Sequence, residues 1–346
     1  MEGIHEILER LDSSIQRDVL ATIIDVQGSA YLKEGASMLF REDGTQIGLL
    51  SAGCLEEDIK ARVEDKSHIE FSQTIAFDMS AEDDLTWGQG SGCNGVLQVL
   101  LETVDSCLRS HLITLRTYLE EGKSVIVAKR LKDDLSVSDY VFITENHQFG
   151  KWEGDFSCKI HSYLHSRNRI EKNGIVYMNE FSSYVYFQHY LPKPRLVIFG
   201  AGRDARPLVE FAAEAGFTVL VSDWRPALCN KNYFPKASDF IVGFPDKAIQ
   251  QIQIRKEDYV VLLTHSFQRD QEILQCLLHE KLNYLGVLGS KKRTMRLLNY
   301  YEKNNDIHSP IGLPIGAEGP EEIAISIVAD LIRVKHLLLN SKVQAV

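Results

Sequence analysis

The stretch Arg195-Leu196-Val197-Ile198-Phe199-Gly200-Ala201-Gly202-Arg203-Asp204-Ala205 decides the fold of the C-terminal half of the chain. Its apolar, partly β-branched start predicts a buried strand, and the turn that follows has the spacing G-x-G-x-x-A, which joins a strand to a helix in dinucleotide-binding folds. Asp223 stands 23 positions after Gly200, at the end of the next predicted strand. Such folds place a ribose-binding acidic residue there. The stretch therefore predicts a strand–turn–helix unit that opens a parallel sheet.

Strands and helices alternate through the rest of this half. The sequence predicts strands at residues 195–200, 217–223, 239–243, 258–264 and 284–289. It predicts helices at residues 203–216, 246–254, 268–281, 291–304 and 320–339. This alternation is typical of an α/β fold with a Rossmann-like, doubly wound parallel sheet. The stiff segment Pro192-Lys193-Pro194 precedes it, so we expect one domain at residues 1–190 and a second at 191–346.

The glycine turn suggests a ligand for this second domain. The amides of Gly200 and Gly202 would hold a pyrophosphate, and Asp223 would bind a ribose. Asp223 favours NAD, whereas the neighbouring Arg225 leaves NADP open. Asp204 adds a negative charge beside the phosphate position, so a Rossmann domain without a ligand remains an alternative.

Three further segments follow predicted strands or precede a predicted helix. His265, in Thr264-His265-Ser266, is either structural or a proton donor and acceptor. Ser290 suits a helix N-cap, and Lys291-Lys292-Arg293 after it would either bind a phosphate or form a solvated first turn. Near the C-terminus, Pro320-Glu321-Glu322 fits a helix start, whereas Gly316-Ala317-Glu318 is a candidate for contact with a ligand.

The N-terminal half mixes both kinds of element. We expect strands at residues 18–26, 35–40, 45–50, 69–77 and 96–102 and a helix at 55–63, which predicts a mixed α/β domain. Residues 106–190 are less informative: a helix at 108–121, strands at 124–128, 140–144 and 175–178, and an edge strand at 182–190. We expect this middle segment to complete the sheet of the first domain.

Two glycine-rich loops of this half each carry a cysteine: Ser51-Ala52-Gly53-Cys54-Leu55-Glu56 and the loop from Trp87 to Gly95. A thiolate is a soft nucleophile and a soft metal ligand, so Cys54 and Cys93 are candidate catalytic and metal-binding residues. Loop glycines let backbone amides crowd around an anion. The candidate binding residues of the two loops are Gly53, Gly90, Gly92 and Asn94.

The reactivity of Cys54 depends on two opposing effects. The N-terminus of the following helix would lower the pKa of its thiol, whereas the acidic segment Glu56-Glu57-Asp58 would raise it. The remaining cysteines lack this context, and none of the six forms a C-x-x-C pair, so zinc-ribbon and iron–sulfur sites are disfavoured. We interpret Cys107, Cys158 and Cys276 as buried small hydrophobic residues or as incidental residues.

Composition narrows the class of protein. The net charge is −10, which disfavours nucleic-acid and anionic-membrane surfaces. The N-terminus has no signal-peptide pattern, and no apolar run reaches the length of a membrane span. We expect a cytoplasmic protein.

Taken together, these motifs resemble the XdhC/CoxI family of maturation factors of molybdenum hydroxylases such as xanthine dehydrogenase. The resemblance rests on spaced segments in the same order: Gly28-Ser29, Gly35-Ala36-Ser37-Met38, the two cysteine loops, Phe199 to Gly202, Leu263 to His265, Leu288 to Ser290, and Ile315 to Glu322. Two positions depart from it. Ala52 replaces a usual glycine, and Arg203 replaces a frequent histidine whose proton chemistry arginine cannot supply.

The resemblance implies that the chain binds the molybdenum cofactor, protects it while a terminal sulfur is installed, and delivers it to the hydroxylase. Cys54 or Cys93 would ligate molybdenum or carry sulfur, and Glu56 would hydrogen-bond the pterin. The implied partners are the target hydroxylase, a cysteine desulfurase and a second copy of the chain.

Two other functions remain open. The first is an NAD(P)-dependent oxidoreductase, or a flavin (FAD) protein, that uses Gly200 to Asp223, with His265 exchanging protons. The second is a non-catalytic subunit of a xanthine dehydrogenase assembly. The catalytic hydroxylase itself is disfavoured because the chain lacks the clustered cysteines that iron–sulfur centres need.

Overall fold

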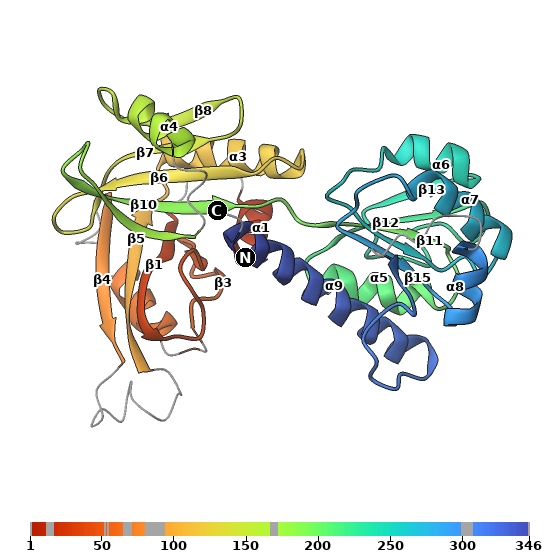
Figure 1. Cartoon of the computed structure of the whole chain (residues 1–346). Coiled ribbons are helices and arrows are strands. Elements are labelled where there is room, and N and C mark those ends of the chain that lie inside the picture. The colour runs from red at the N-terminus through yellow and green to blue at the C-terminus, as the bar shows by residue number, and fades with distance from the viewer. Residues whose placement is uncertain are drawn as a thin grey trace. The chain divides into compact units, whose positions relative to one another are not determined.

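The computed structural model describes residues 2–11, 17–51, 53, 55–64, 71–79, 94–166, 172–298 and 307–344. The chain divides into two compact units, Met1–Pro192 and Lys193–Val346 (Figure 1). Each is described separately below. Among the described helices, none combines the length and apolar content needed to cross a bilayer.

The N-terminal unit begins with a five-stranded antiparallel sheet in the order β3-β2-β1-β5-β4. Its strands are β1 (Val19–Ser29), β2 (Ser37–Phe40), β3 (Gln46–Gly48), β4 (Ser72–Asp78) and β5 (Asn94–Thr103). β1 pairs along its whole length with β5, from Val19 opposite Thr103 to Ser29 opposite Asn94. The mixed α/β class expected for this half is confirmed.

A second antiparallel sheet, in the order β8-β7-β6-β10-β9, contradicts two expectations. Its strands are β6 (Val125–Leu131), β7 (Val137–Ile143), β8 (Gln148–Lys151), β9 (Gly174–Met178) and β10 (Ser183–Tyr190). The middle segment does not extend the first sheet, because among the described strands β6 pairs only with β7 and β10. β10 is not an edge strand either. It lies between β6 and β9, and Tyr186 and Phe187 bury side chains on both of its faces.

Helices cover both sheets of this unit and fill the space between them. They are α1 (Glu2–Arg10), α2 (Glu56–Glu64), α3 (Ser106–Glu120) and α4 (Phe156–Ser166). α2 packs on one face of the first sheet through Ile59, together with Leu55, which precedes the helix. α1 and α3 pack in a cluster that contains residues of both sheets, and α4 covers the far face of the second sheet. A buried ion pair between Glu102 of β5 and Lys129 of β6 links the two sheets.

The C-terminal unit has the predicted architecture. A six-stranded parallel sheet has the order β13-β12-β11-β14-β15-β16, which is that of a doubly wound Rossmann fold. Its strands are β11 (Arg195–Phe199), β12 (Thr218–Asp223), β13 (Asp239–Val242), β14 (Tyr259–Leu262), β15 (Tyr284–Val287) and β16 (Ile307–His308). Its helices are α5 (Ala205–Glu214), α6 (Pro245–Ile252), α7 (Phe267–Leu277), α8 (Lys291–Leu298) and α9 (Gly319–Gln344).

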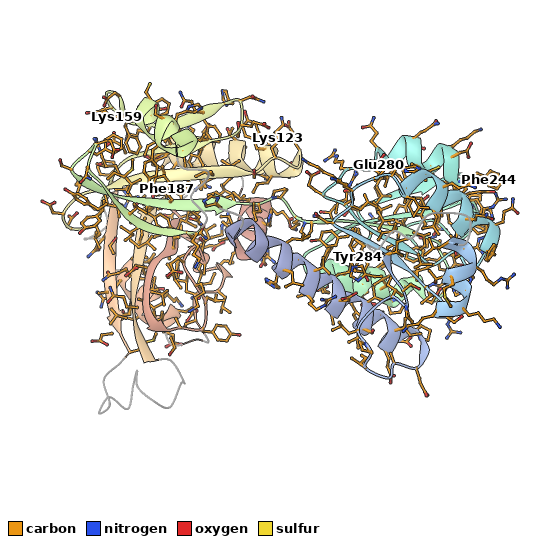
Figure 2. The ribbon with its side chains drawn as sticks, in the orientation of Figure 1. Lys123, Lys159, Phe187, Phe244, Glu280 and Tyr284 are labelled. Carbon is orange, nitrogen blue, oxygen red and sulfur yellow. The ribbon has the colours of Figure 1, made fainter. Side chains whose placement is uncertain are left out.

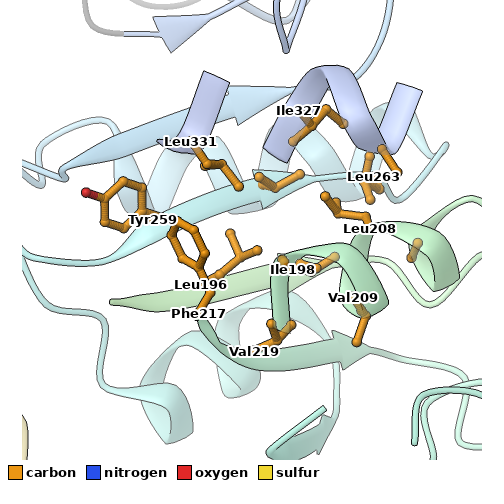
Figure 3. Packing of buried hydrophobic residues seen from close by; sticks show 14 of the residues in the cluster. Leu196, Ile198, Leu208, Val209, Phe217, Val219, Tyr259, Leu263, Ile327 and Leu331 are labelled. Carbon is orange, nitrogen blue, oxygen red and sulfur yellow. The ribbon is translucent and has the colours of Figure 1, made fainter. Parts of the chain in front are cut away.

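Both faces of this sheet are buried, as a parallel sheet requires. On one face, Leu208 of α5 and Ile327 and Leu331 of α9 pack over Ile198 and its neighbours (Figure 3). On the other face, α6, α7 and α8 cover a second cluster that contains Val197, Val260 and Val287. Because all strands are parallel, the loops after β11, β12, β14, β15 and β16 lie at the same end of the sheet, where the strands have their carboxyl ends.

Candidate functional site

The first cysteine loop is organised around the carboxylate of Glu56, the first residue of α2. One carboxylate oxygen accepts hydrogen bonds from the amides of Leu50 and Ser51, at 3.1 and 2.7 Å. The other accepts from the Ser51 hydroxyl at 2.5 Å and from the Leu55 amide at 3.2 Å. The Ser51 hydroxyl oxygen also accepts from the amides of Gly53 and Leu55. The side chains of Ser51 and Glu56 therefore hold the described backbone of this loop.

This arrangement explains the ionisation of Glu56, which is 7% exposed. Burial alone would raise the pKa of its carboxyl, but the hydrogen bonds from Ser51 and from the backbone outweigh burial and hold the pKa below its ordinary value. The carboxylate faces its own loop, and both of its oxygens are engaged there. In this structure Glu56 thus holds the loop backbone.

Gly53 has a backbone conformation and surroundings of its own. Its φ is +109°, a conformation that favours glycine, and a Cβ built on it would meet nothing within 4 Å. Cys54 and the family departure at Ala52 lie outside the described residues.

The second cysteine loop connects β4 to β5. Cys93, Gly90 and Gly92 lie outside the described residues, but both ends of the loop are defined. At one end Met79 donates its amide to the carbonyl oxygen of Gly95 at 3.0 Å. At the other, Asn94 starts β5 opposite Ser29. Gly95 is required there, because a Cβ would lie 2.5 Å from the carbonyl oxygen of Gln27.

The described residues that flank the two loops share one apolar cluster. Leu55, which follows Cys54, packs in the same cluster as Met79 and Leu97, which flank the second loop. β1 and β3 are each antiparallel to β2, so they run in the same direction. The chain therefore leaves β3 at the end of the sheet where β1 ends and β5 begins. The topology thus directs both loops to one side of the first sheet.

In the C-terminal unit, Gly200 makes the turn after β11. Its φ is +118°, and a Cβ there would lie 2.4 Å from the carbonyl oxygen of Leu263. Only glycine allows the backbone after β11 to pass so close to the end of β14. This is the point where the strand order reverses, which is where open α/β sheets bind ligands.

Asp223, the predicted ribose-binding acid, is engaged by the protein itself. Its carboxylate accepts from the amide of Ala201 at 2.7 Å, from the amide of Arg225 at 2.8 Å, and from the Arg225 guanidinium at 2.9 and 2.8 Å. Burial would raise the pKa of Asp223, but the hydrogen bonds from Arg225 and Ala201 outweigh it and lower the pKa. Asp223, at the end of β12, is thus hydrogen-bonded to the glycine turn through the amide of Ala201.

The strand-end residues Asp204 and His265 form a pair over the glycine turn. The His265 Nε2 atom lies 2.6 Å from Asp204 Oδ2. Since a carboxylate only accepts, Nε2 carries the hydrogen of this bond. A Cβ built on Gly202 would lie 2.6 Å from Asp204 Oδ1, so the carboxylate folds back against the turn. His265 also has a left-handed backbone, with φ +56°.

An ion pair between a buried carboxylate and a partly exposed arginine supports the neighbouring loops. Asp270 of α7 accepts from the Thr264 hydroxyl and from the Arg293 guanidinium, each at 2.5 Å. Arg293 also donates to the carbonyl oxygen of Leu288 at 3.1 Å. The Ser290 hydroxyl accepts from the Arg293 amide at 3.3 Å, which is the predicted N-cap contact of α8. Arg293 is thus engaged within the loops, whereas Lys291 and Lys292 are exposed.

The loop with Gly316-Ala317-Glu318 follows β16 at the same edge. The amide of Glu318 donates to the carboxylate of Glu322 at 2.7 Å, a contact that closes the start of α9. The Glu318 side chain is exposed. The sequence marked this segment and the helix start after it, but it did not predict the contact between Glu318 and Glu322.

The other described cysteines are unlike a reactive site. Burial raises the pKa of the Cys229 thiol to about 11, and the thiol donates to the carbonyl oxygen of Val221. Cys158 and Cys276 are exposed, so they are incidental residues and not the buried small hydrophobic residues that were the other expectation, and Cys107 is half-buried. Within the described part of the chain, no three histidine, cysteine, aspartate or glutamate residues form a metal-binding group.

Comparison with known proteins matches all three parts of the chain to family models. The models are described as the XdhC and CoxI family (residues 14–66), the BH1974-like central domain (106–191) and the XdhC Rossmann domain (196–331). Over 335 residues the chain is 42% identical to a protein of Bacillus subtilis (strain 168) that is named as a probable subunit of xanthine dehydrogenase. The match covers 97% of this chain and 98% of that protein.

Two further relatives cover most of the chain. It is 24% identical over 331 residues to the molybdenum cofactor insertion chaperone PaoD of Escherichia coli (strain K12), covering 92% of this chain and 83% of PaoD. A crystal structure from Bacillus halodurans, described as that of a xanthine dehydrogenase, aligns with a TM-score of 0.85 and 48% identity over 96% of each chain.

Proposed function

The chain belongs to the XdhC and CoxI family, and from this premise we propose that it is a maturation factor that binds the molybdenum cofactor for a xanthine dehydrogenase-type hydroxylase. Two relatives support the role. One is named as a subunit of xanthine dehydrogenase, and the other as a molybdenum cofactor insertion chaperone. The chain is an accessory protein in this proposal, not the catalytic hydroxylase.

The observation that carries the proposal is the loop held by Glu56. Five hydrogen bonds to Glu56 and to the Ser51 hydroxyl oxygen come from loop amides, which fixes the backbone on both sides of Cys54. A thiolate held on such a loop is a suitable ligand for a soft metal centre. Glu56 acts by positioning this loop rather than by touching the pterin.

The two cysteine loops form one binding site in this proposal. The shared cluster of Leu55, Met79 and Leu97 supports it, because it anchors described residues beside both loops. Cys54 and Cys93 ligate molybdenum or carry sulfur, and the amides of Gly53, Gly90, Gly92 and Asn94 face the anionic groups of the cofactor. The bound cofactor supplies the redox chemistry, which takes place later in the hydroxylase.

The rest of the proposed cycle follows from this role. The protein shields the cofactor in the cytoplasm while a cysteine desulfurase installs its terminal sulfur, and then delivers it to the hydroxylase. It acts as a homodimer.

Transfer to a cofactor-free hydroxylase tests the function. Cofactor-loaded protein is mixed anaerobically with the purified apo-hydroxylase, and xanthine oxidation is followed over time. We expect activation that is lost with Cys54→Ala or Cys93→Ala and kept with Cys158→Ala, which removes an exposed cysteine elsewhere. Equal activation by free cofactor and by the loaded protein would contradict the proposal.

The name of the B. subtilis relative favours a second candidate, a non-catalytic subunit of a xanthine dehydrogenase assembly. A stable complex with the hydroxylase, purified without any cofactor on this chain, would support the subunit role. A complex that dissociates after cofactor transfer would support the maturation factor.

A further inference from the structure

We propose that the loops at the C-terminal ends of the parallel strands in the C-terminal unit form a nucleotide site, and that the side chains of these loops keep the site closed. Its ligand is the ribonucleoside 5′-diphosphate group of a free nucleotide or of a nucleotide cofactor. Three internal contacts occupy the positions that the base, the ribose and the diphosphate would take. The site is built from residues of the C-terminal unit, and its test needs no molybdenum cofactor, so the test is independent of the proposed function.

The base would bind at the aromatic rings of Trp224 and Phe244, which both contact the guanidinium of Arg269. The guanidinium carbon of Arg269 lies 4.6 Å from the ring centre of Phe244 and 5.8 Å from that of Trp224. Phe244 lies at the outer surface of the unit and is 49% exposed (Figure 2). A planar guanidinium and a nucleobase both stack on aromatic rings, so the same pair can accept a base.

Arg269 has a second partner ready. Its guanidinium donates to both carboxylate oxygens of Glu272, at 2.8 and 2.6 Å, one turn along α7. It can therefore leave the aromatic pair without losing its ion pair. A base can therefore displace the Arg269 guanidinium from the aromatic rings at a small cost in free energy.

The position of the ribose is Asp223. In dinucleotide-binding folds, this acid binds ribose hydroxyl groups. Here the Arg225 guanidinium covers both carboxylate oxygens while stacking on Trp224, with 4.6 Å from guanidinium carbon to ring centre. The Arg225 side chain is 41% exposed, so it can swing into solvent. A ribose diol would then replace its hydrogen bonds.

The position of the diphosphate is the glycine turn, where the Asp204–His265 pair lies against Gly202. A phosphate approaching the amides of the turn has to displace this carboxylate, which would also repel it. A hollow lined by Asp223, Trp224 and Thr264 among others has a volume of about 10 Å³. That is about the room that one water molecule needs, so the site opens only when these side chains move.

The first experiment titrates the full-length protein with ADP and measures affinity by calorimetry. Arg225→Ala uncovers Asp223, and we expect it to bind ADP about tenfold more tightly than the wild type, since hydrogen bonds to a charged group carry this much. The gain should be smaller for 2′-deoxy-ADP and absent in Arg225→Ala combined with Asp223→Asn. Arg225→Gln, which keeps a donor, should show an intermediate gain and serves if the alanine variant does not fold.

Two variants test the base and the specificity of the effect. Trp224→Leu in the Arg225→Ala background should weaken ADP binding about tenfold and leave the binding of inorganic pyrophosphate unchanged. Lys335→Ala is the matched control, because Lys335 also contacts an aromatic ring with its charged group but lies away from the proposed site. Its ammonium group lies over the ring of Phe217, which precedes β12 at the opposite end of the sheet. It should leave ADP binding unchanged.

Parallel titrations with ADP, NAD and FAD distinguish a free nucleotide from a nucleotide cofactor as the source. If NAD or FAD binds more tightly than ADP, the ligand of the site is a nucleotide cofactor and not a free nucleotide. The proposal is overturned if Arg225→Ala and Arg225→Gln bind none of the three ligands, or if ADP and 2′-deoxy-ADP bind Arg225→Ala equally.

Discussion

The hydroxyl of Ser51 donates to the carboxylate of Glu56 over 2.5 Å, and this bond lies across the loop that carries Cys54. Both residues are buried, and the Ser51 hydroxyl oxygen accepts two amide hydrogens in turn. A single buried carboxylate thus sets the backbone of a loop whose cysteine is the proposed ligand of the cofactor.

Glu56→Gln should destabilise this loop. The glutamine amide nitrogen would face amide donors, which leaves buried groups unsatisfied at a cost of about 2–3 kcal/mol. Urea unfolding followed by circular dichroism at pH 7 measures the loss. Glu57→Gln, an exposed neighbour in the same turn, is the control and should change the free energy of unfolding little.

The same variant has a defined pH dependence. The pKa of Glu56 in the folded state lies below its ordinary value of 4.5, so its carboxylate stabilises the fold fully above that pH. This contribution is lost as the pH falls through the lowered folded-state pKa. The stability difference between wild type and Glu56→Gln should therefore shrink below pH 4.5, and a difference that grows on acidification would contradict the ionised state.

Gly200→Ala should destabilise the C-terminal unit. The methyl group would overlap the carbonyl oxygen of Leu263, and the residue would keep a positive φ, so we expect a loss of about 2–4 kcal/mol. Thermal unfolding compares it with Gly243→Ala, whose Cβ would have its nearest neighbour at 3.8 Å. Equal melting temperatures for the two variants would show that the turn can relax.

Arg293→Ala should be more damaging than its surface position suggests. It leaves the buried carboxylate of Asp270 without its charged partner, and breaking such a pair costs about 3–5 kcal/mol. The double variant Arg293→Ala with Asp270→Ala should recover part of the loss, because the uncompensated charge is then gone. Lys292→Ala, the exposed neighbour, should unfold like the wild type in the same denaturant series.

His265→Val tests the strained backbone after β14. A β-branched residue at φ +56° should cost about 1–2 kcal/mol, whereas His265→Asn should cost less because asparagine tolerates this conformation. The pair with Asp204 is largely exposed on the histidine side and adds little. Melting temperatures rank the two variants, and a lower value for the asparagine variant would indicate that the ring itself stabilises the fold.

Local patterns were sufficient for the parallel sheet. The glycine turn at Gly200 and the apolar strands after it are separated by short connections, so each element could be located from its own residues. The second antiparallel sheet could not be predicted in this way. Its central strand β10 pairs with β6 more than fifty positions earlier, and the alternation in Tyr184 to Tyr190 does not reveal that both faces are covered.

The sequence singled out candidate residues, but it did not predict their contacts. Glu56, Asp223 and His265 were all singled out from the sequence, yet each is engaged by another side chain of the chain itself. Asp204 and His265 are 61 positions apart, and only the parallel order of β11 and β14 brings them together. The group of Trp224, Phe244 and Arg269 was missed, because stacking across loops leaves no spacing pattern.

The most direct test of the central claim is anaerobic loading of the purified protein with molybdenum cofactor, followed by gel filtration and assay of molybdenum and pterin. We expect both to remain with the wild type and to be lost with Cys54→Ala, while Cys276→Ala, which removes an exposed cysteine of the C-terminal unit, keeps them. Glu56→Gln should retain less than Glu57→Gln. Retention by Cys54→Ala equal to that of the wild type would contradict the assignment of this loop, and no retention by the wild type would contradict the proposed function.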